Sequence, residues 1–297
     1  MPSSNANRVL LEQIVGGPII TMVPERWGFT NRTDVVTLAD GDRVVVQRYR
    51  RRKDAEYRLR VMQALRTPAA QSGIAIPEIR RFDLDADPAW AIFELLPGLP
   101  VPEAGEASPD GPRFPFFARR MGELLARLRR LPATGLPLND HWADPGRLAA
   151  RAAAWVKDVP ELNNEQRAAL ALVIDEWPTL FSHRQAVLAH GDFAPVNVLI
   201  DGESVTGLVD FESVRLADPL FDVAWWAWVV EFHHPSVIQR AWTPFLEGAE
   251  IDTDEPQLPD RIRSLQTLRL LELVADPNAI DSDIRRILVN QLRAILA

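Results

Sequence analysis

The chain has 297 residues, 47% of them hydrophobic, which suits one large or two medium domains with a substantial core. It contains no cysteine, so a disulfide, a zinc–thiolate site and a thiol nucleophile are excluded. The formal net charge of −8 disfavours nucleic acid as the main partner, because a phosphate backbone requires a basic surface. The same charge suits a cationic small molecule.

Neither a secretion signal nor a membrane span is predicted. The first seven residues are polar and lack a signal-peptide pattern. No apolar run approaches the roughly 20 residues that a membrane helix requires. We therefore expect a cytoplasmic protein with no membrane partner.

Strands are predicted mainly in the first third of the chain, where β-branched runs alternate with turn residues. Asp40 and Gly41 predict a hairpin turn between two of these strands. The predicted elements are, in order, a helix at 5–15, strands at 19–23, 32–39 and 43–50, a helix at 54–66, and strands at 74–82 and 90–95.

Helices are predicted for most of the remaining chain, after a loop at 99–114 that is rich in Pro, Gly and acidic residues. They are expected at 116–130, 145–156, 165–180, 219–232, 236–247, 259–274 and 279–296. This segregation of strands from helices predicts an α+β chain of two lobes, divided into residues 1–96 and 97–297.

A short polar motif, HGDFAPVN at residues 190–197, interrupts two apolar runs. Downstream, Asp-Gly at 201–202 predicts a hairpin turn, and a further apolar run ends at Asp210. Asp192 therefore lies on a loop, while Asn197 begins one strand of the hairpin and Asp210 ends the other. The hairpin brings Asn197 and Asp210 close together, and their side-chain oxygens are suitable ligands for a divalent metal ion.

A loop carboxylate beside a metal-binding Asn and Asp is the arrangement that phosphoryl transfer uses. Asn197 follows Asp192 by five residues, as in the kinase catalytic loop. A single Asp in a loop is more often a turn former, but polar side chains between buried strands are costly unless they pair or bind a ligand. His190 is expected to hold the loop by a hydrogen bond rather than to act as a base.

Together these motifs resemble the aminoglycoside phosphotransferase and choline-kinase-like family over most of the chain, weakly at its ends. As in that family, Gly191 replaces the Arg of the kinase His-Arg-Asp motif, and DFE at 210–212 precedes DPLFDVA at 218–224. The resemblance implies a two-lobed protein-kinase-like fold with an N-terminal antiparallel sheet and one main helix. A larger helical C-terminal lobe would hold the catalytic loop and the acceptor site.

The resemblance also implies transfer of the γ-phosphoryl group of ATP or GTP to a hydroxyl of a small molecule. Asp192 would orient and deprotonate that hydroxyl, and Asn197 and Asp210 would hold Mg²⁺. Glu212 would support the metal site indirectly, through the residues that bind the ion rather than by binding it. Asp222 is expected to accept hydrogen bonds from the backbone of the catalytic loop.

The phosphate-binding cation is expected on the third strand. Kinases place a lysine there, but this chain has only two lysines, Lys53 and Lys157, and Arg48 occupies the corresponding place. Glu56, in the first turn of the next helix, is expected to pair with Arg48.

Two further segments resemble nucleotide-binding parts of the family. Gly28 and Asn31 fit a Gly-x-x-Asn pattern in the loop that covers the nucleotide. The segment FELLPG at 93–98 resembles the kinase hinge, where backbone groups of Glu94 and Leu96 would bind adenine.

The acceptor is expected to be a cation, with an aminoglycoside- or macrolide-type antibiotic favoured, because the chain is acidic and its second lobe carries carboxylates near the hairpin. These carboxylates are Glu212, Asp218, Asp222, Glu231 and Glu247. A Trp-rich helix argues against a small cationic acceptor. If Trp225, Trp226 or Trp228 lined the pocket, its ring would favour a bulky apolar acceptor such as a macrolide.

Two other classes of function stay open. The chain fits a metabolic kinase of choline, homoserine or a sugar equally well, because the helical lobe carries no local motif for acceptor specificity. A nucleotide-binding protein without catalysis is disfavoured by the intact Asp192, Asn197 and Asp210.

Overall fold

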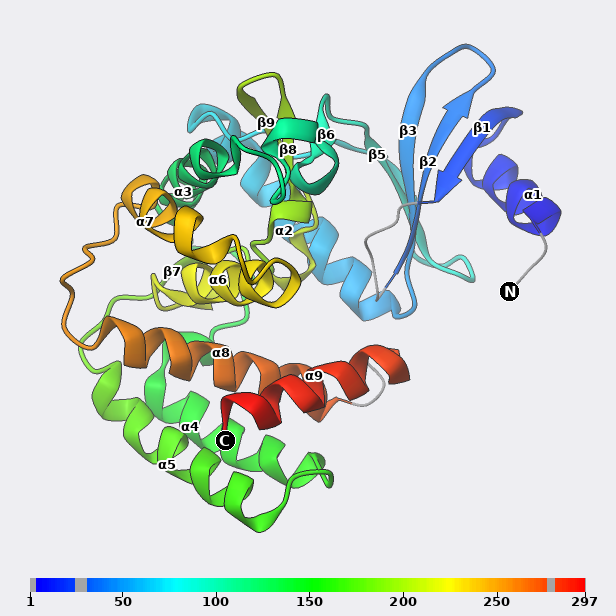
Figure 1. Ribbon diagram of the computed structural model, residues 1–297. Helices are drawn as coiled ribbons and strands as arrows, with labels where there is room; N and C mark the ends of the chain where they lie inside the picture. Colours follow the sequence, from blue (N-terminus) through cyan, green and yellow to red (C-terminus); the bar gives the residue numbers. More distant parts are fainter. Residues whose placement is uncertain (1–3, 25–30, 277–280, 297) are drawn as a thin grey trace.

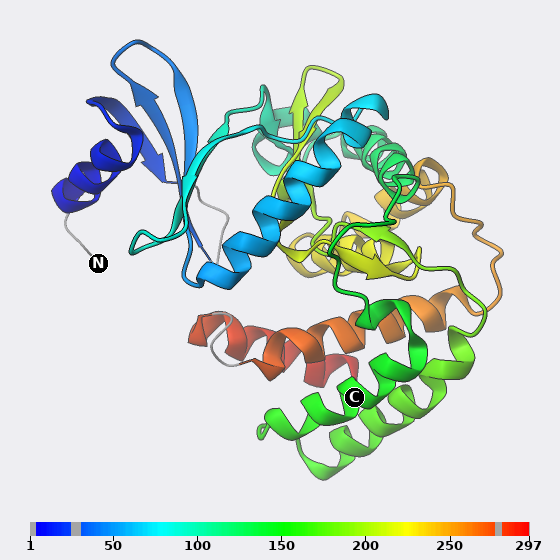
Figure 2. The same ribbon diagram turned by 180° about the vertical axis from the view of Figure 1, so that it is seen from behind.

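The computed structural model describes residues 4–24, 31–276 and 281–296. These residues form a smaller lobe that holds a five-stranded sheet and a larger lobe that consists mainly of helices, with the helix α2 beside both (Figures 1 and 2). None of the described helices is both long and apolar enough to span a bilayer.

The smaller lobe is an antiparallel sheet in the order β1-β2-β3-β5-β4. Its elements are α1 (Ser4–Val15), β1 (Ile19–Pro24), β2 (Arg32–Leu38), β3 (Arg43–Arg48), α2 (Arg52–Gln71), β4 (Ile79–Asp83) and β5 (Trp90–Glu94). The helix α1 packs on one face of the sheet, and α2 faces the other. The predicted strand at 74–82 starts only at Ile79, because Ile74 and Ile76 enter the core ahead of the sheet.

The strand β3 decides which side chains reach the space between the lobes, because successive side chains point to opposite faces. Val44 and Val46 pack with α1 in a small core, whereas Val45 packs against the main core. Gln47 and Arg48 continue this alternation. Gln47 therefore points toward α2 and the larger lobe, and Arg48 points toward α1.

The described part of the larger lobe is helical around two small β-sheets, β10-β7 and β6-β8-β9. Its elements are β6 (Leu99–Pro100), α3 (Phe114–Arg129), α4 (Pro145–Trp155), α5 (Asn164–Leu180), β7 (Val187–Ala189), β8 (Val198–Asp201), β9 (Ser204–Leu208), β10 (Arg215–Ala217), α6 (Phe221–His233), α7 (Ile238–Gly248), α8 (Leu258–Ala275) and α9 (Ser282–Ile295). The predicted hairpin is β8–β9, with Gly202 at a positive φ of 57° in its turn. The strand β10 was not predicted. It pairs with β7, which directly precedes the polar motif.

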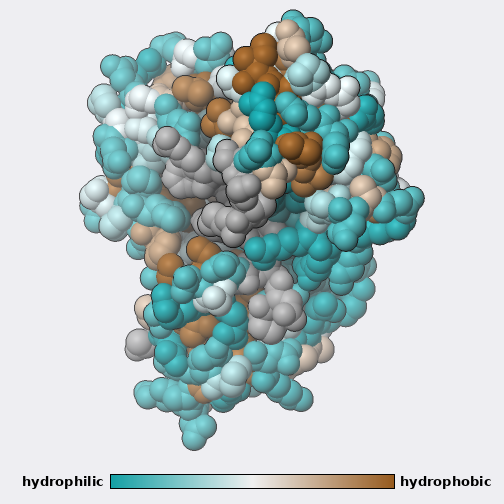
Figure 3. Space-filling view, turned by 90° about the vertical axis from the view of Figure 1, so that its right-hand side faces the viewer, coloured by the Kyte–Doolittle hydropathy of each residue, from teal (hydrophilic) through white to brown (hydrophobic). Residues whose placement is uncertain are grey.

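The surface on the side of the smaller lobe is mainly hydrophilic, with hydrophobic spots scattered over it (Figure 3). Exposed apolar side chains of this lobe include Ile20 and Val23 on the edge strand β1. Single exposed apolar side chains are normal for a folded chain and by themselves indicate no binding surface.

Candidate active site

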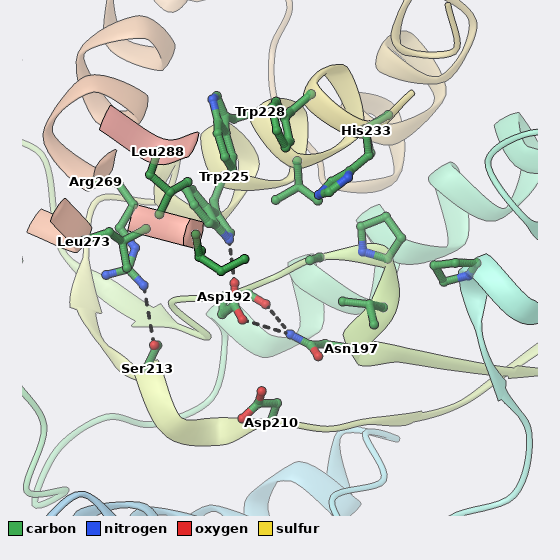
Figure 4. A pocket seen from close by; sticks show the side chains of 18 of the residues that line it. Asp192, Asn197, Asp210, Ser213, Trp225, Trp228, His233, Arg269, Leu273 and Leu288 are labelled. Atoms are coloured by element: carbon green, nitrogen blue, oxygen red, sulfur yellow. Dashed lines mark hydrogen bonds between the residues drawn. The ribbon is translucent and has the colours of Figure 1, made fainter. Parts of the chain in front are cut away.

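A cavity of about 380 Å³ is lined by residues of both lobes (Figure 4). One part, the polar end, is lined by Asn31, Thr33, Gln47, Asn197, Asp210 and Glu212. Another part, the apolar end, is lined by Trp228, Val229, Phe232, Leu273, Ile284, Ile287 and Leu288. Asp192 and Trp225 lie where the two ends meet.

The loop before Asp192 has a backbone that only glycine fits at position 191. Gly191 has a φ of 84°, and a Cβ placed there would lie 1.9 Å from the carbonyl oxygen of Ser213. The backbone N–H groups of His190 and Gly191 donate to the carboxylate of Asp222 at 2.7 and 2.9 Å, as predicted. The ring of His190 contacts the carbonyl of Val209 at 3.0 Å, and burial lowers the pKa of this imidazole.

Asp192 is held through both of its carboxylate oxygens. The indole Nε1 of Trp225 donates to Oδ1 at 2.7 Å, and the amide Nδ2 of Asn197 lies 3.3 Å from Oδ2. The same Nδ2 donates to the backbone carbonyl of Asp192 at 2.8 Å, which closes the five-residue loop between the two side chains. The carboxylate is therefore fixed in orientation at the wall of the cavity.

Asp210 follows the end of β9 in a left-handed conformation, with a φ of 67°. The N–H of Val209 donates to the carbonyl of Asn197 at 3.0 Å, so the two predicted metal ligands are on adjacent backbone segments. Burial and then the charge of Glu212 raise the pKa of Asp210 to about 7. A bound cation would favour the ionised carboxylate here.

The donor set around Asp210 fits Mg²⁺ only in part. Asp210 Oδ1 has no hydrogen-bond partner among the described residues, and the amide nitrogen of Asn197 is turned to Asp192, which leaves the amide oxygen for a metal ion. Within the described part of the chain, no group of three His, Asp or Glu side chains could hold a metal ion. Mg²⁺ at this site would therefore take its remaining ligands from phosphate and water, as is usual for this ion.

The predicted ion pair between Arg48 and Glu56 is wrong. Arg48 is buried on the α1 face of the sheet, where it pairs with Asp34 and donates to Asn7 at 2.7 Å. Glu56 is 43% exposed and pairs with Arg52 on the surface of α2. The prediction put Arg48 on the face of β3 that meets the cavity, but that face carries its neighbour Gln47, because successive side chains of a strand point to opposite faces.

Another arginine stands where a cation was expected. Arg58, in the middle of α2, is buried and lies 2.6 Å from Glu212 Oε1 and 3.5 Å from Asp210 Oδ1. Its guanidinium also donates to the side-chain oxygen of Gln47 on β3. Gln47 Nε2 donates in turn to Glu212 at 3.0 Å. The sequence contained a signal for Arg58, since it lies within the apolar stripe of its helix.

Of the other predicted nucleotide contacts, only Asn31 lines the cavity among the described residues. Asn31 lines the polar end and donates to Glu212 at 2.6 Å, whereas Gly28 lies outside the described residues. Glu94 ends β5, and its backbone N–H already donates to the carbonyl of Glu78 at 2.9 Å. Leu96 is buried, and neither Glu94 nor Leu96 lines the cavity.

Most of the carboxylates that were expected to attract a cationic acceptor near the hairpin do not line the cavity. Of the five, only Glu212 lines the cavity, and it belongs to the polar end. Asp218 pairs with Arg184, Glu247 pairs with Arg119, and Glu231 is exposed. The ion-pair partners and the exposure of these carboxylates keep them from binding the acceptor, and their nearness to the hairpin along the chain did not predict this.

The Trp-rich helix α6 divides its rings between the cavity and the core. Trp225 and Trp228 line the cavity and stack on each other with ring centroids 4.7 Å apart. Trp226 is fully buried and stacks on Phe245 at 3.8 Å. The guanidinium of Arg269 lies 5.5 Å from the ring of Trp225, which ties α8 to the residue that holds Asp192.

Comparison with known proteins places these residues in a family. The sequence matches the model of the phosphotransferase enzyme family over residues 22–264. It is 30% identical over 158 residues to an aminoglycoside 3'-phosphotransferase of Streptomyces fradiae, covering 51% of this chain and 57% of that protein. It is 28% identical over 159 residues to that of Streptomyces ribosidificus, covering 52% and 59%. The chain thus matches little more than half the length of these curated relatives.

Solved structures resemble the chain over nearly its whole length. A macrolide 2'-phosphotransferase type I has a TM-score of 0.70 at 21% identity, with 98% of this chain and 97% of that chain covered. The GDP complex of an aminoglycoside 2'-phosphotransferase-IIIa has a TM-score of 0.72 at 17% identity, with coverage of 100% and 99%. These similarities confirm the predicted α+β, two-lobed kinase-like fold.

Proposed function

Because the chain belongs to the phosphotransferase enzyme family, we propose that it transfers the γ-phosphoryl group of ATP or GTP to a hydroxyl of a small molecule. The observation that carries this proposal is the carboxylate of Asp192, held at both oxygens on the wall of a cavity that also contains Asn197 and Asp210. We retain the division into residues 1–96 and 97–297, with the nucleotide between the lobes.

In the proposed reaction, Asp192 accepts the proton of the acceptor hydroxyl while its carboxylate stays oriented by Trp225 and Asn197. Asn197 and Asp210 would hold Mg²⁺, which when bound neutralises charge on the nucleotide phosphates. Asn31, which lines the cavity, would contact the nucleotide. Base binding by backbone groups of Glu94 and Leu96 stays a prediction from the family resemblance, since neither residue lines this cavity.

The acceptor that fits the cavity best is an antibiotic-type hydroxyl compound with a large apolar face, such as a macrolide. The apolar end is formed by rings and aliphatic side chains, and a polycationic sugar would lose hydration there without gaining carboxylate partners. The basic side chains that line the cavity are Arg269, His233 and His234, and burial, followed by the charge of His234, lowers the pKa of His233. These features favour an apolar acceptor over a polyamine.

The alternatives gain no support from the cavity. Choline, homoserine and simple sugars are small and polar or charged, and they would leave the apolar end unfilled. A binding protein without catalysis would not need a carboxylate fixed at both oxygens beside a metal-binding pair.

The test is a coupled assay of nucleotide turnover over a panel of hydroxyl compounds, with macrolides, aminoglycosides, choline, homoserine and sugars compared at equal concentration. We expect turnover above the basal hydrolysis rate with macrolide-type compounds, and loss of that turnover in Asp192→Asn. Turnover only with aminoglycosides would overturn the acceptor class and leave the kinase proposal standing. No phosphorylated product from any acceptor would overturn the kinase proposal.

A further inference from the structure

We propose that Arg58, presented by the helix α2, is the charge-compensating residue of the nucleotide site and replaces the strand lysine of kinases. The inference rests on the proposed function, since it assigns a residue to the same site. The role of Arg58 follows from its three partners, which are Glu212, Asp210 and Gln47.

The polar end of the cavity carries an excess of negative charge. Asp192, Asp210 and Glu212 all line the cavity, and a nucleoside triphosphate would add further negative charge. Arg58 lies close to two of these carboxylates, at 2.6 Å from Glu212 and 3.5 Å from Asp210. Without it, bound Mg²⁺ would have to offset these carboxylates together with the phosphates.

The strand β3 offers no charge of its own toward the cavity. The side chain that points there is the neutral Gln47, and its amide oxygen accepts a hydrogen bond from Arg58. Arg48, the neighbouring cation, is committed to Asp34 on the opposite face of the sheet. The usual order is thus inverted, because the helix carries the cation and the strand carries its neutral partner.

Arg58 also joins the two lobes at the metal-binding segment. It belongs to α2, whereas Glu212 lies in the short 3₁₀ helix η6 (Phe211–Ser213) that follows Asp210. The side chain of Arg58 is buried, and its Nε has no hydrogen-bond partner among the described residues. Arg58 therefore acts as a positioning residue, through Glu212 and Gln47, on the groups that would meet the metal and the phosphates.

The experiment measures the affinity of the full chain for a non-hydrolysable ATP analogue, with and without Mg²⁺ and with no acceptor present. We expect Arg58→Met to weaken binding in Mg²⁺ by about tenfold or more, because it leaves a carboxylate unpaired beside the phosphates. Arg58→Lys should recover most of this affinity, since it restores the charge. Affinity in Arg58→Met equal to that of the wild type would overturn the inference.

Two matched controls separate this role from simple support of the fold. Arg48→Met removes a buried, ion-paired arginine of the same lobe, on the opposite face of β3, and should lower the melting temperature with little change in nucleotide affinity. Tyr57→Phe removes two hydrogen bonds of α2 without a change in charge, one donated to the carbonyl of Val214 at 2.6 Å and one accepted from the N–H of Asn139 at 3.1 Å, and it should also leave affinity nearly unchanged. Equal loss of affinity in Arg48→Met and Arg58→Met would overturn the inference.

A double variant tests charge compensation directly and covers the case in which Arg58→Met folds poorly. Arg58→Met combined with Glu212→Gln removes one positive and one negative charge, so of the two carboxylates beside Arg58 only Asp210 is left without its cation. We expect this double variant to bind the analogue more tightly than Arg58→Met alone. If Arg58→Met does not fold, the comparison is with a second double variant, Arg58→Glu with Glu212→Gln, which should bind the analogue less tightly than the first. No gain would overturn the inference. Absence of binding by the wild type would instead overturn the proposed function.

Discussion

The two ends of the cavity are built from different parts of the chain and by different interactions. At the polar end, Asp192, Asn197 and Asp210 lie within 19 residues of sequence, from 192 to 210, and the hairpin β8–β9 brings them together. At the apolar end, side chains come from α6, α8 and α9, which meet only in the folded structure. Chemistry that depends on a fixed spacing leaves a motif in the sequence, whereas a surface assembled from three helices does not.

The largest expected effect concerns Asp192, the proposed base, which lies where the two ends meet. Asp192→Asn keeps the size of the side chain, and its amide oxygen can still accept the hydrogen bond from Trp225, but its NH₂ group cannot accept from Asn197 and the proton acceptor is lost. We expect turnover to fall by about 10²–10⁴, the usual contribution of a positioned general base, with nucleotide affinity nearly intact. Rapid-quench measurement of the chemical step checks this, and wild-type turnover in the variant would exclude Asp192 as the base.

The next effect addresses the polar end alone. Asp210→Ala removes the charged member of the proposed metal-binding pair, and we expect the apparent affinity for Mg²⁺ to fall by about 10–100-fold. Asn197→Ala removes a neutral ligand and should have a smaller effect on Mg²⁺. Titration of Mg²⁺ at fixed nucleotide compares the two, and an unchanged Mg²⁺ requirement in Asp210→Ala would contradict the metal assignment.

The residue that joins the two ends gives an intermediate effect. Trp225→Phe keeps an aromatic ring in the cavity and removes the N–H that donates to Asp192 Oδ1. We expect turnover to fall by about tenfold, because the substitution removes a hydrogen bond to a charged group, with little change in the Michaelis constant for nucleotide. Steady-state kinetics with both substrates varied would show it, and a change confined to acceptor binding would count against a role in orienting Asp192.

At the apolar end the expected effect is smaller. Ile287 lines the cavity and is 41% exposed, so Ile287→Ala should disturb the fold little. We expect the Michaelis constant for an apolar acceptor to rise by about three- to tenfold, because the substitution removes apolar surface that the acceptor would cover. Leu172→Ala on α5 is the control, since Leu172 is 63% exposed and does not line the cavity. Equal effects of the two substitutions would show that the acceptor does not contact α9.

The smallest effect is that of salt. Attraction between a cationic acceptor and carboxylates would be screened as the Debye length falls from about 10 Å at 0.1 M to about 3 Å at 1 M. An acceptor held by apolar contacts should instead show a Michaelis constant that changes by less than about twofold over this range. A steep rise with ionic strength would restore the cationic acceptor that the composition of the chain first suggested.

Most of the fold was predictable because long periodic segments and β-branched runs fix the type of an element. The strand β10 was missed because it has three residues and exists through its pairing with β7. Arg48 was misplaced for a related reason. The sequence shows that side chains of β3 alternate, but it does not show which face meets the larger lobe, and that choice separates Gln47 from Arg48.

The position of Arg58 shows what a closer look at the sequence would have found. Ala55, Leu59 and Met62 form an apolar stripe on α2, and Arg58 lies on the same face. A buried arginine in such a stripe requires a partner. That partner, Glu212, lies 154 residues away along the chain, and no local sequence pattern connects it with Arg58.

The apolar end also bears on how the acceptor range of this chain would change under selection. Trp225 on α6 and Arg269 on α8 are bonded to the catalytic loop, so substitutions there would alter the chemistry as well as the acceptor. Ile284 and Ile287 on α9 line the same cavity, whereas the groups that hold Asp192 belong to Trp225 and Asn197. Under selection by a new compound, substitutions in α9 would therefore be the readiest way to accept that compound. They would change the contacts to the acceptor and leave the residues that hold Asp192 unchanged.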